Sequence, residues 1–62
     1  MKIVTAVKDY KHKISDMKVI SKGTWYVVFK ESEDQYYISN DYSRKMWVDK
    51  DLFINGIQNK NN

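Results

Sequence analysis

The sequence predicts a small all-β domain, and three observations support this fold class. β-Branched and aromatic residues gather in short runs, which favour strands. Charged or small polar residues separate these runs, as they do in turns between antiparallel strands. The 62 residues are 42% hydrophobic and 15% aromatic, so the chain can form one core and is too apolar for an intrinsically disordered protein. We therefore expect one domain at residues 1–54 and a polar C-terminal tail at residues 55–62.

Four runs of strand-forming residues follow one another along the chain. They cover residues 2–7, 24–29, 35–39 and 45–48. Polar clusters at residues 31–34 and 40–43 separate the last three runs, which predicts antiparallel hairpins. The alternation of side chains along a strand predicts their directions. If Tyr26 and Val28 face the core, Trp25 and Val27 face outward, and if Ile38 faces the core, Tyr37 faces outward.

The C-terminal part of the domain, residues 49–54, resembles a single helical turn that leads into a short closing strand. Asp49 is the candidate N-cap of this turn. The tail that follows is polar and offers almost nothing for burial, so we expect it to fray.

Residues 9–22 are mostly polar and allow two interpretations. A long, partly ordered hairpin loop fits, with Met17, Val19 and Ile20 as its apolar anchors. The alternative is an amphipathic helix over residues 8–20, in which Ile14 would share one side with these anchors.

Composition argues against several classes of protein. There is no cysteine and no apolar run near 18 residues, so we expect no disulfide, no thiolate site and no membrane span. Lys8 and Asp9 interrupt the apolar N-terminal run, which we interpret as a first strand and not as an export signal. A reducing cytoplasm is the compatible compartment.

The residues that usually perform catalysis are almost absent. His12 is the only histidine, and it lies between two lysines. The sequence positions no carboxylate to orient it, so we expect a solvent-exposed structural role. The acidic residues at 31–34 and 49–51 are explained by turns and lack the number and spacing of metal ligands. No nucleophile-base pair or glycine-rich phosphate loop is present. We expect no enzyme, no metal and no cofactor.

Four short segments resemble sequences of one known family. Residues 6–10 are similar to its Ala-Leu-Tyr-Asp-Tyr opening, and Lys22-Gly23 to the turn that enters its second strand. Tyr36-Tyr37 lies where the family has paired tryptophans, and residues 47–53 are similar to its closing segment. Over most of its length the chain thus resembles Src-homology-3-like proteins. The resemblance implies a small five-stranded barrel with one short helical turn near the C-terminus.

The same segments are also similar to short stand-alone barrel proteins of phages and prophages of Gram-positive bacteria. The shared features are a Lys-Asp-Tyr opening, a Lys-Gly turn, a Tyr-Tyr-Ile strand and a closing segment in which four residues separate Trp from Leu-Phe. This resemblance implies an accessory phage protein that binds and modulates a host protein in the bacterial cytoplasm. The fold by itself does not specify a function.

In Src-homology-3 domains an aromatic groove binds extended proline-rich peptides. The resemblance places Tyr10, Tyr36 and Trp47 in the walls of such a groove. Lys8 and Leu52, however, replace two tyrosines of the family, and Asp49 replaces a proline. The long loop is usually acidic in the family, whereas residues 11–13 make it basic here. The resemblance therefore implies an acidic partner and not a basic proline-rich peptide.

Charge is unevenly distributed along the chain. Residues 1–22 carry six lysines and two aspartates, for a net +4, whereas residues 23–43 carry one lysine and four acids, for a net −3. Arg44 and Lys45 then extend the basic character. We expect a basic patch beside exposed aromatic residues, because nine aromatic residues exceed what so small a core can hide. Exposed ones are expected among Trp25, Tyr36, Tyr37, Tyr42 and Trp47.

These observations predict a binding module. The candidate partner-binding residues are the apolar Tyr10, Tyr36, Trp47 and Leu52 with the cationic Lys8, Lys11, Lys13 and Arg44. A protein with an acidic surface is the expected partner of a monomer or weak homodimer. Two alternatives remain open. The same residues suit the phosphates and bases of a nucleic acid, and exposed strand edges suit a subunit of an oligomer.

Overall fold

The computed structural model describes residues 2–57, and its regular elements are seven strands and one short helix. The strands are β1 (Lys2–Ala6), β2 (Tyr10–Lys11), β3 (Lys18–Ile20), β4 (Trp25–Glu31), β5 (Gln35–Ser39), β6 (Lys45–Asp49) and β7 (Phe53–Asn55). The 3-10 helix η1 (Lys50–Leu52) joins β6 to β7. The predicted all-β class and the helical turn near the C-terminus are confirmed.

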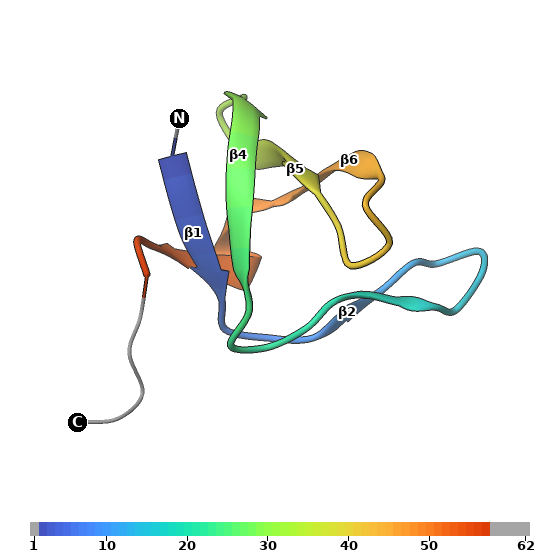
Figure 1. The fold of residues 1–62 in the computed structure, drawn as a ribbon. Helices are drawn as coiled ribbons and strands as arrows, with labels where there is room; N and C mark the ends of the chain where they lie inside the picture. The colour runs from blue at the N-terminus through green and yellow to red at the C-terminus, as the bar shows by residue number, and fades with distance from the viewer. Residues whose placement is uncertain (1, 58–62) are drawn as a thin grey trace.

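Five of the strands form one antiparallel sheet in the order β6-β5-β4-β1-β7 (Figure 1). The sheet curls into a half-barrel, so that β7 lies beside β1 and the two ends of the domain meet. This pairing includes Asn55 and continues at Gly56, whose N–H donates to the Ile3 carbonyl at 2.8 Å. The paired domain thus includes two residues that the sequence assigned to the tail. Residues 58–62 of that tail lie outside the described residues.

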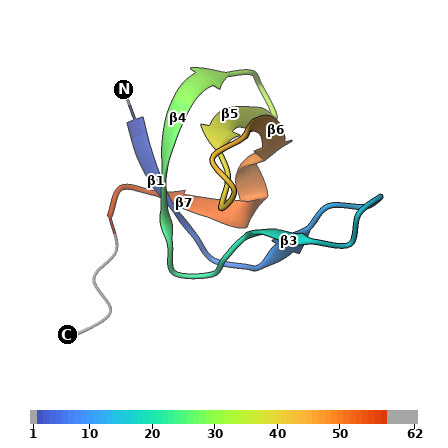
Figure 2. The same cartoon turned by 45° about the vertical axis from the view of Figure 1, so that its right-hand side comes forward.

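Strands β2 and β3 form a separate hairpin, which extends away from the curled sheet in both views (Figures 1 and 2). Its tip is closed by a hydrogen bond of 2.9 Å from the His12 N–H to the Met17 carbonyl. The hairpin interpretation of residues 9–22 is therefore confirmed, and the helical alternative is wrong. The reason is that Ile14, which had to face the core in a helix, is 90% exposed at the tip.

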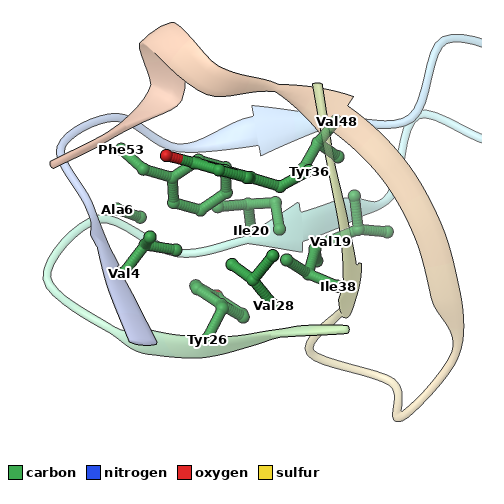
Figure 3. Packing of buried hydrophobic residues seen from close by; sticks show 10 residues of the cluster. All are labelled: Val4, Ala6, Val19, Ile20, Tyr26, Val28, Tyr36, Ile38, Val48 and Phe53. Atoms are coloured by element: carbon green, nitrogen blue, oxygen red, sulfur yellow. The ribbon is translucent and has the colours of Figure 1, made fainter. Parts of the chain in front are cut away.

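One hydrophobic core lies inside the curl of the sheet (Figure 3). It consists of Val4, Ala6, Val19, Ile20, Tyr26, Val28, Tyr36, Ile38, Val48 and Phe53. The ring of Phe53 packs edge-on against Tyr26 and Tyr36, with 5.9 Å between ring centroids in each pair. Because Val19 and Ile20 come from β3, the base of the hairpin belongs to the core even though its tip does not.

The predicted directions of the side chains on β4 and β5 are confirmed. Tyr26, Val28 and Ile38 are buried, whereas Trp25 is 55% exposed on the other side of the sheet. The register between β4 and β5 shifts between Val28 and Lys30, which is the signature of a β-bulge. As a result, Phe29 and Lys30, which follow Val28, are both exposed, and so is Glu31 at the end of β4.

Asp49 lies at the predicted N-cap position, but the prediction that it caps the helix is wrong. Asp49 occupies the N-cap position of η1, but its side chain makes no capping hydrogen bond. Its Oδ1 accepts a hydrogen bond of 3.2 Å from Gln35 Nε2, because Asp49 is still the last residue of β6 and lies opposite Gln35. Within residues 2–57, no helix is both long and apolar enough to cross a membrane.

Candidate functional site

The structure does not bring the four predicted apolar contact residues together on one exposed surface. Tyr36 is only 6% exposed and forms part of the core, because it shares the inner face of β5 with Ile38. Tyr10 and Leu52 are half-buried against the same core. The expectation that Tyr36 is an exposed anchor is therefore corrected by its burial.

Trp47 lies on the outer face of the sheet and is 42% exposed. It is opposite Tyr37 on the neighbouring strand, with 5.1 Å between the ring centroids. Two lysines lie over aromatic rings of this face. Lys30 Nζ is 5.5 Å from the centroid of Tyr37, and Lys45 Nζ is 4.6 Å from that of Phe29. We call Phe29, Tyr37 and Trp47 the outer aromatic face.

We use the word hairpin for residues 8–22, which include β2, β3 and the residues that flank them. The predicted cations of this hairpin are exposed and have no carboxylate partner among residues 2–57. This holds for Lys8, Lys11 and Lys13, and also for Lys18 and Lys22. The nearby Asp9 uses its carboxylate differently, since it accepts a hydrogen bond of 2.7 Å from the Lys22 backbone N–H. The charges of the hairpin lysines are therefore not neutralised within the described fold.

A pocket lies between the hairpin and the turn that joins β5 to β6 (residues 40–44), with a volume of about 420 Å³. It is lined by His12, Ser15, Met17 and Val19 from the hairpin and by Asn40, Tyr42 and Arg44 from the turn. Most of the lining is apolar. Arg44 is thus the one predicted contact residue that lines this pocket, and the hairpin lysines Lys11 and Lys13 flank the lining residue His12 in sequence.

Asn40 shapes the turn side of the pocket. Its Oδ1 accepts hydrogen bonds from the backbone N–H groups of Tyr42 at 2.8 Å and Arg44 at 3.1 Å. Its backbone N–H donates to the Arg44 carbonyl at 2.8 Å, and Ser43 adopts a left-handed conformation with φ of 61°. Asparagine side chains stabilise turns in this way. Asn40 therefore fixes the backbone from which the side chains of Tyr42 and Arg44 extend.

His12 shapes the hairpin side of the pocket. Its Nδ1 accepts from the backbone N–H groups of Ile14 at 3.3 Å and Ser15 at 3.4 Å. A ring nitrogen that accepts hydrogen bonds carries no proton, so the neutral ring has its proton on Nε2. The predicted structural role is confirmed by these bonds. The predicted exposure is wrong, because the ring is half-buried in the pocket wall.

A hydrogen-bond network connects the two walls of the pocket. The Tyr26 hydroxyl donates to Asp41 Oδ1 at 2.5 Å and accepts from the Ser21 N–H at 2.8 Å. Ser21 Oγ donates to Asp41 Oδ2 at 2.7 Å, and the Asp41 N–H donates to the Val19 carbonyl at 2.9 Å. Burial raises the pKa of the Tyr26 hydroxyl, and the bond to Asp41 raises it further. We call Tyr26, Ser21 and Asp41 the Tyr26 network.

The end of the molecule near η1 has the opposite charge. A second hollow there is lined by Glu33, Asp34, Asp49, Lys50 and Asp51. The Glu31 carboxylate binds Lys50 Nζ at 2.7 Å and Lys2 Nζ at 3.3 Å. The hydrogen bonds from Lys50 and then Lys2 lower the pKa of Glu31. Among residues 2–57, no group of three or more histidines and acids is placed to hold a metal ion.

The sequence identified several residues that line the pocket, but it did not predict that the hairpin and the turn contact each other. Met17 and Val19 were predicted hairpin anchors, and Tyr42 was a candidate exposed aromatic residue, which the structure confirms at 52% exposure. The contact between the hairpin and the turn spans more than twenty residues, and no sequence signal indicated it. The pocket is therefore a finding of the structure.

Comparisons with known proteins give this chain no relative. No protein-family model matches it, and neither a curated protein nor a solved structure matches it.

Proposed function

We propose that this chain is a non-enzymatic binding module, a Src-homology-3-like barrel whose basic hairpin docks on an acidic surface of another protein. The observation that supports this proposal is the set of exposed hairpin lysines without carboxylate partners among residues 2–57. Arg44, on the facing turn, adds a further cation beside the pocket. The antiparallel half-barrel and η1 are compatible with the proposed fold family.

The charge separation gives the approach of a partner a preferred direction. Residues 8–22 carry five lysines and two aspartates, for a net +3. Residues 30–34 and 49–51 together carry two lysines and five acids, for a net −3. An acidic partner is attracted to the hairpin and repelled by the η1 end. Such complementarity accelerates association and fixes orientation.

The resemblance of residues 8–10, 22–23, 36–38 and 47–53 to phage barrel proteins supports an origin in a phage or prophage. In that setting the partner is a protein of the bacterial host, which this chain modulates in the cytoplasm. The chemistry of the hairpin defines the partner only by its acidic surface.

A pull-down from a Gram-positive lysate tests this function. Wild-type protein is compared with Lys11→Gln/Lys13→Gln, and with Lys30→Gln as a control that removes a cation from the outer face. We expect one dominant acidic protein that survives nuclease treatment, is depleted by the hairpin variant and is retained by the control. Equal capture by all three proteins would contradict the proposal.

Nucleic acid is the second candidate, and the exposed ring of Tyr42 beside Arg44 favours it. Exposed aromatic rings next to cations stack bases while the cations bind phosphates. In the same pull-down, this function predicts a set of proteins that disappears on nuclease treatment. Binding would also weaken steeply between low and moderate salt.

A further inference from the structure

Two side chains that line the pocket offer a ligand only hydrogen-bond donors, whereas the Tyr42 hydroxyl can donate or accept. The Arg44 guanidinium has no bond to another side chain among the described residues, and an arginine offers donors only. His12 uses Nδ1 as an acceptor, so its neutral ring presents an Nε2 donor. The polar acceptors of Asn40 and Ser15 are already engaged by backbone N–H groups. A ligand that pairs with Arg44 and His12 must therefore bring acceptors.

We propose that the pocket binds an acidic peptide segment of a partner protein, with one apolar side chain inserted and a neighbouring carboxylate paired with Arg44. This inference rests on the proposed function, because it specifies the chemistry of the partner at the same surface.

The lining residues match both parts of this ligand, the apolar side chain and the carboxylate. Met17, Val19 and the ring of Tyr42 provide apolar surface, and methionine adapts its shape to different side chains. The planar guanidinium of Arg44 matches the two oxygens of a carboxylate, which gives a strong, charge-assisted pair. A volume of about 420 Å³ lies within the range of small-ligand pockets and accommodates one large side chain with its adjoining backbone.

The distribution of the remaining cations favours a peptide over a nucleic acid. A nucleic acid needs a continuous basic track along its phosphates. Among residues 2–57, beyond the hairpin and Arg44, Lys2 and Lys50 are paired with Glu31, and Lys30 and Lys45 lie over rings of the outer face. Within this part of the chain, the surface of cations without such partners is therefore short. One or two carboxylates of a peptide match it better than a long polyanion.

Hydrogen bonds within the protein hold the walls of the pocket together. The Tyr26 network joins the β3 wall to the turn wall, and Asn40 fixes the backbone of the turn. Preorganised walls reduce the entropy lost on binding. A short peptide is therefore sufficient as a probe.

Titrations of ¹⁵N-labelled protein with synthetic peptides test the inference. The first peptide has one phenylalanine flanked by glutamates, the second has alanine for phenylalanine, and the third has glutamines for glutamates. We expect the first to shift the amide signals of Met17, Tyr42 and Arg44 and to bind about tenfold more tightly than either of the others. Equal binding of the first and second, or of the first and third, would overturn the proposal.

Two variants test whether a carboxylate of the peptide pairs with Arg44. Arg44→Gln is expected to weaken the first peptide about tenfold, and Lys45→Gln, the adjacent cation on the outer face, to leave it unchanged. Preserved dispersion of the amide spectrum shows that both variants fold. Equal weakening by both variants would reduce the effect to overall charge and overturn the pairing. Tighter binding of single-stranded oligothymidine at the same amides would overturn the peptide in favour of nucleic acid.

The outcome separates this inference from the proposed function. Suppose that the pull-down no longer captures the partner with Lys11→Gln/Lys13→Gln but still captures it with Arg44→Gln. The proposed binding function is then supported, and the pocket inference fails. If the partner is kept with both, the proposed function fails as well.

Discussion

Each described lysine of the sheet and of η1 has a partner within the fold, whereas the lysines of the hairpin do not pair with a carboxylate there. Lys2 and Lys50 share Glu31, and Lys30 and Lys45 lie over aromatic rings. The hairpin lysines at positions 8, 11, 13, 18 and 22 are exposed. Residues of the same type thus stabilise the fold in one region and remain available for binding in the other.

This difference shows why the net charge of +3 describes the protein poorly. A lysine paired with Glu31 is largely neutralised at short range, and a lysine over a ring has an aromatic face as its contact. The hairpin therefore contributes the part of the positive field that no described carboxylate offsets by an ion pair. Substitutions in each of the two regions test the comparison, as follows.

The largest effect is expected where the hairpin enters the core. Ile20→Ala removes a fully buried side chain from β3 and should lower the free energy of unfolding by about 3 kcal/mol. Urea denaturation measures this change. Ile14→Ala at the exposed tip is the matched control, with an expected change within about 0.5 kcal/mol. Similar changes in both variants would show that the hairpin folds as one unit, without a division between base and tip.

The next effect concerns the network that ties the hairpin to the sheet. Tyr26→Phe removes a hydroxyl that binds both Asp41 and the Ser21 N–H, so it should cost about 2 kcal/mol of unfolding free energy. It should also speed hydrogen exchange at the amides of Ser21 and Asp41. Exchange that is unchanged at these two amides would mean that the network does not hold the pocket walls.

A smaller effect separates the two kinds of lysine. Lys50→Gln removes an ion pair with Glu31 and a contact with the ring of Tyr36, so we expect a loss of about 1 kcal/mol in unfolding free energy. Lys18→Gln in the hairpin should stay within about 0.5 kcal/mol. Thermal denaturation of both variants measures the difference. If the hairpin variant lost more stability than the η1 variant, the comparison would be reversed.

The smallest effect is a pH dependence. The pKa of Glu31 in the folded chain lies below its ordinary value of 4.5, since Lys50 and Lys2 hydrogen-bond its carboxylate. Its contribution to stability is therefore fully present above pH 4.5 and is lost as the pH falls through the lowered folded pKa. The wild type should lose more stability than Glu31→Gln when acidified below this value. Parallel pH profiles from urea denaturation would refute this role of Glu31.

The sequence predicted the fold well where local patterns decide it. Alternation along residues 25–28 and 35–39 indicated the buried faces of two strands, and the apolar run at residues 52–54 indicated the closing strand. The candidate site was harder to predict. Tyr36 was expected in a surface groove, but it alternates with Tyr37 and therefore points into the core. The alternation that places Ile38 in the core also implies that Tyr36 faces inward. The expectation of a groove residue came from the family resemblance and conflicted with this local pattern.

The pocket could not be predicted for a different reason. Its walls meet because Asp41 accepts from Tyr26 and donates its N–H to Val19, and these contacts join residues far apart in the sequence. The sequence contains the turn signal at Asn40 and the apolar anchors of the hairpin. It contains nothing that specifies their distance in space.

The bulge in β4 has a consequence for the solubility of the protein. The register shift after Val28 leaves both Phe29 and Lys30 exposed, so the aromatic surface of the sheet is interrupted by cations. Two copies stacked through this face would bring the lysines at positions 30 and 45 of both copies into one interface. Like charges in a dehydrated contact repel, so the lysines disfavour stacking of two copies through this aromatic surface.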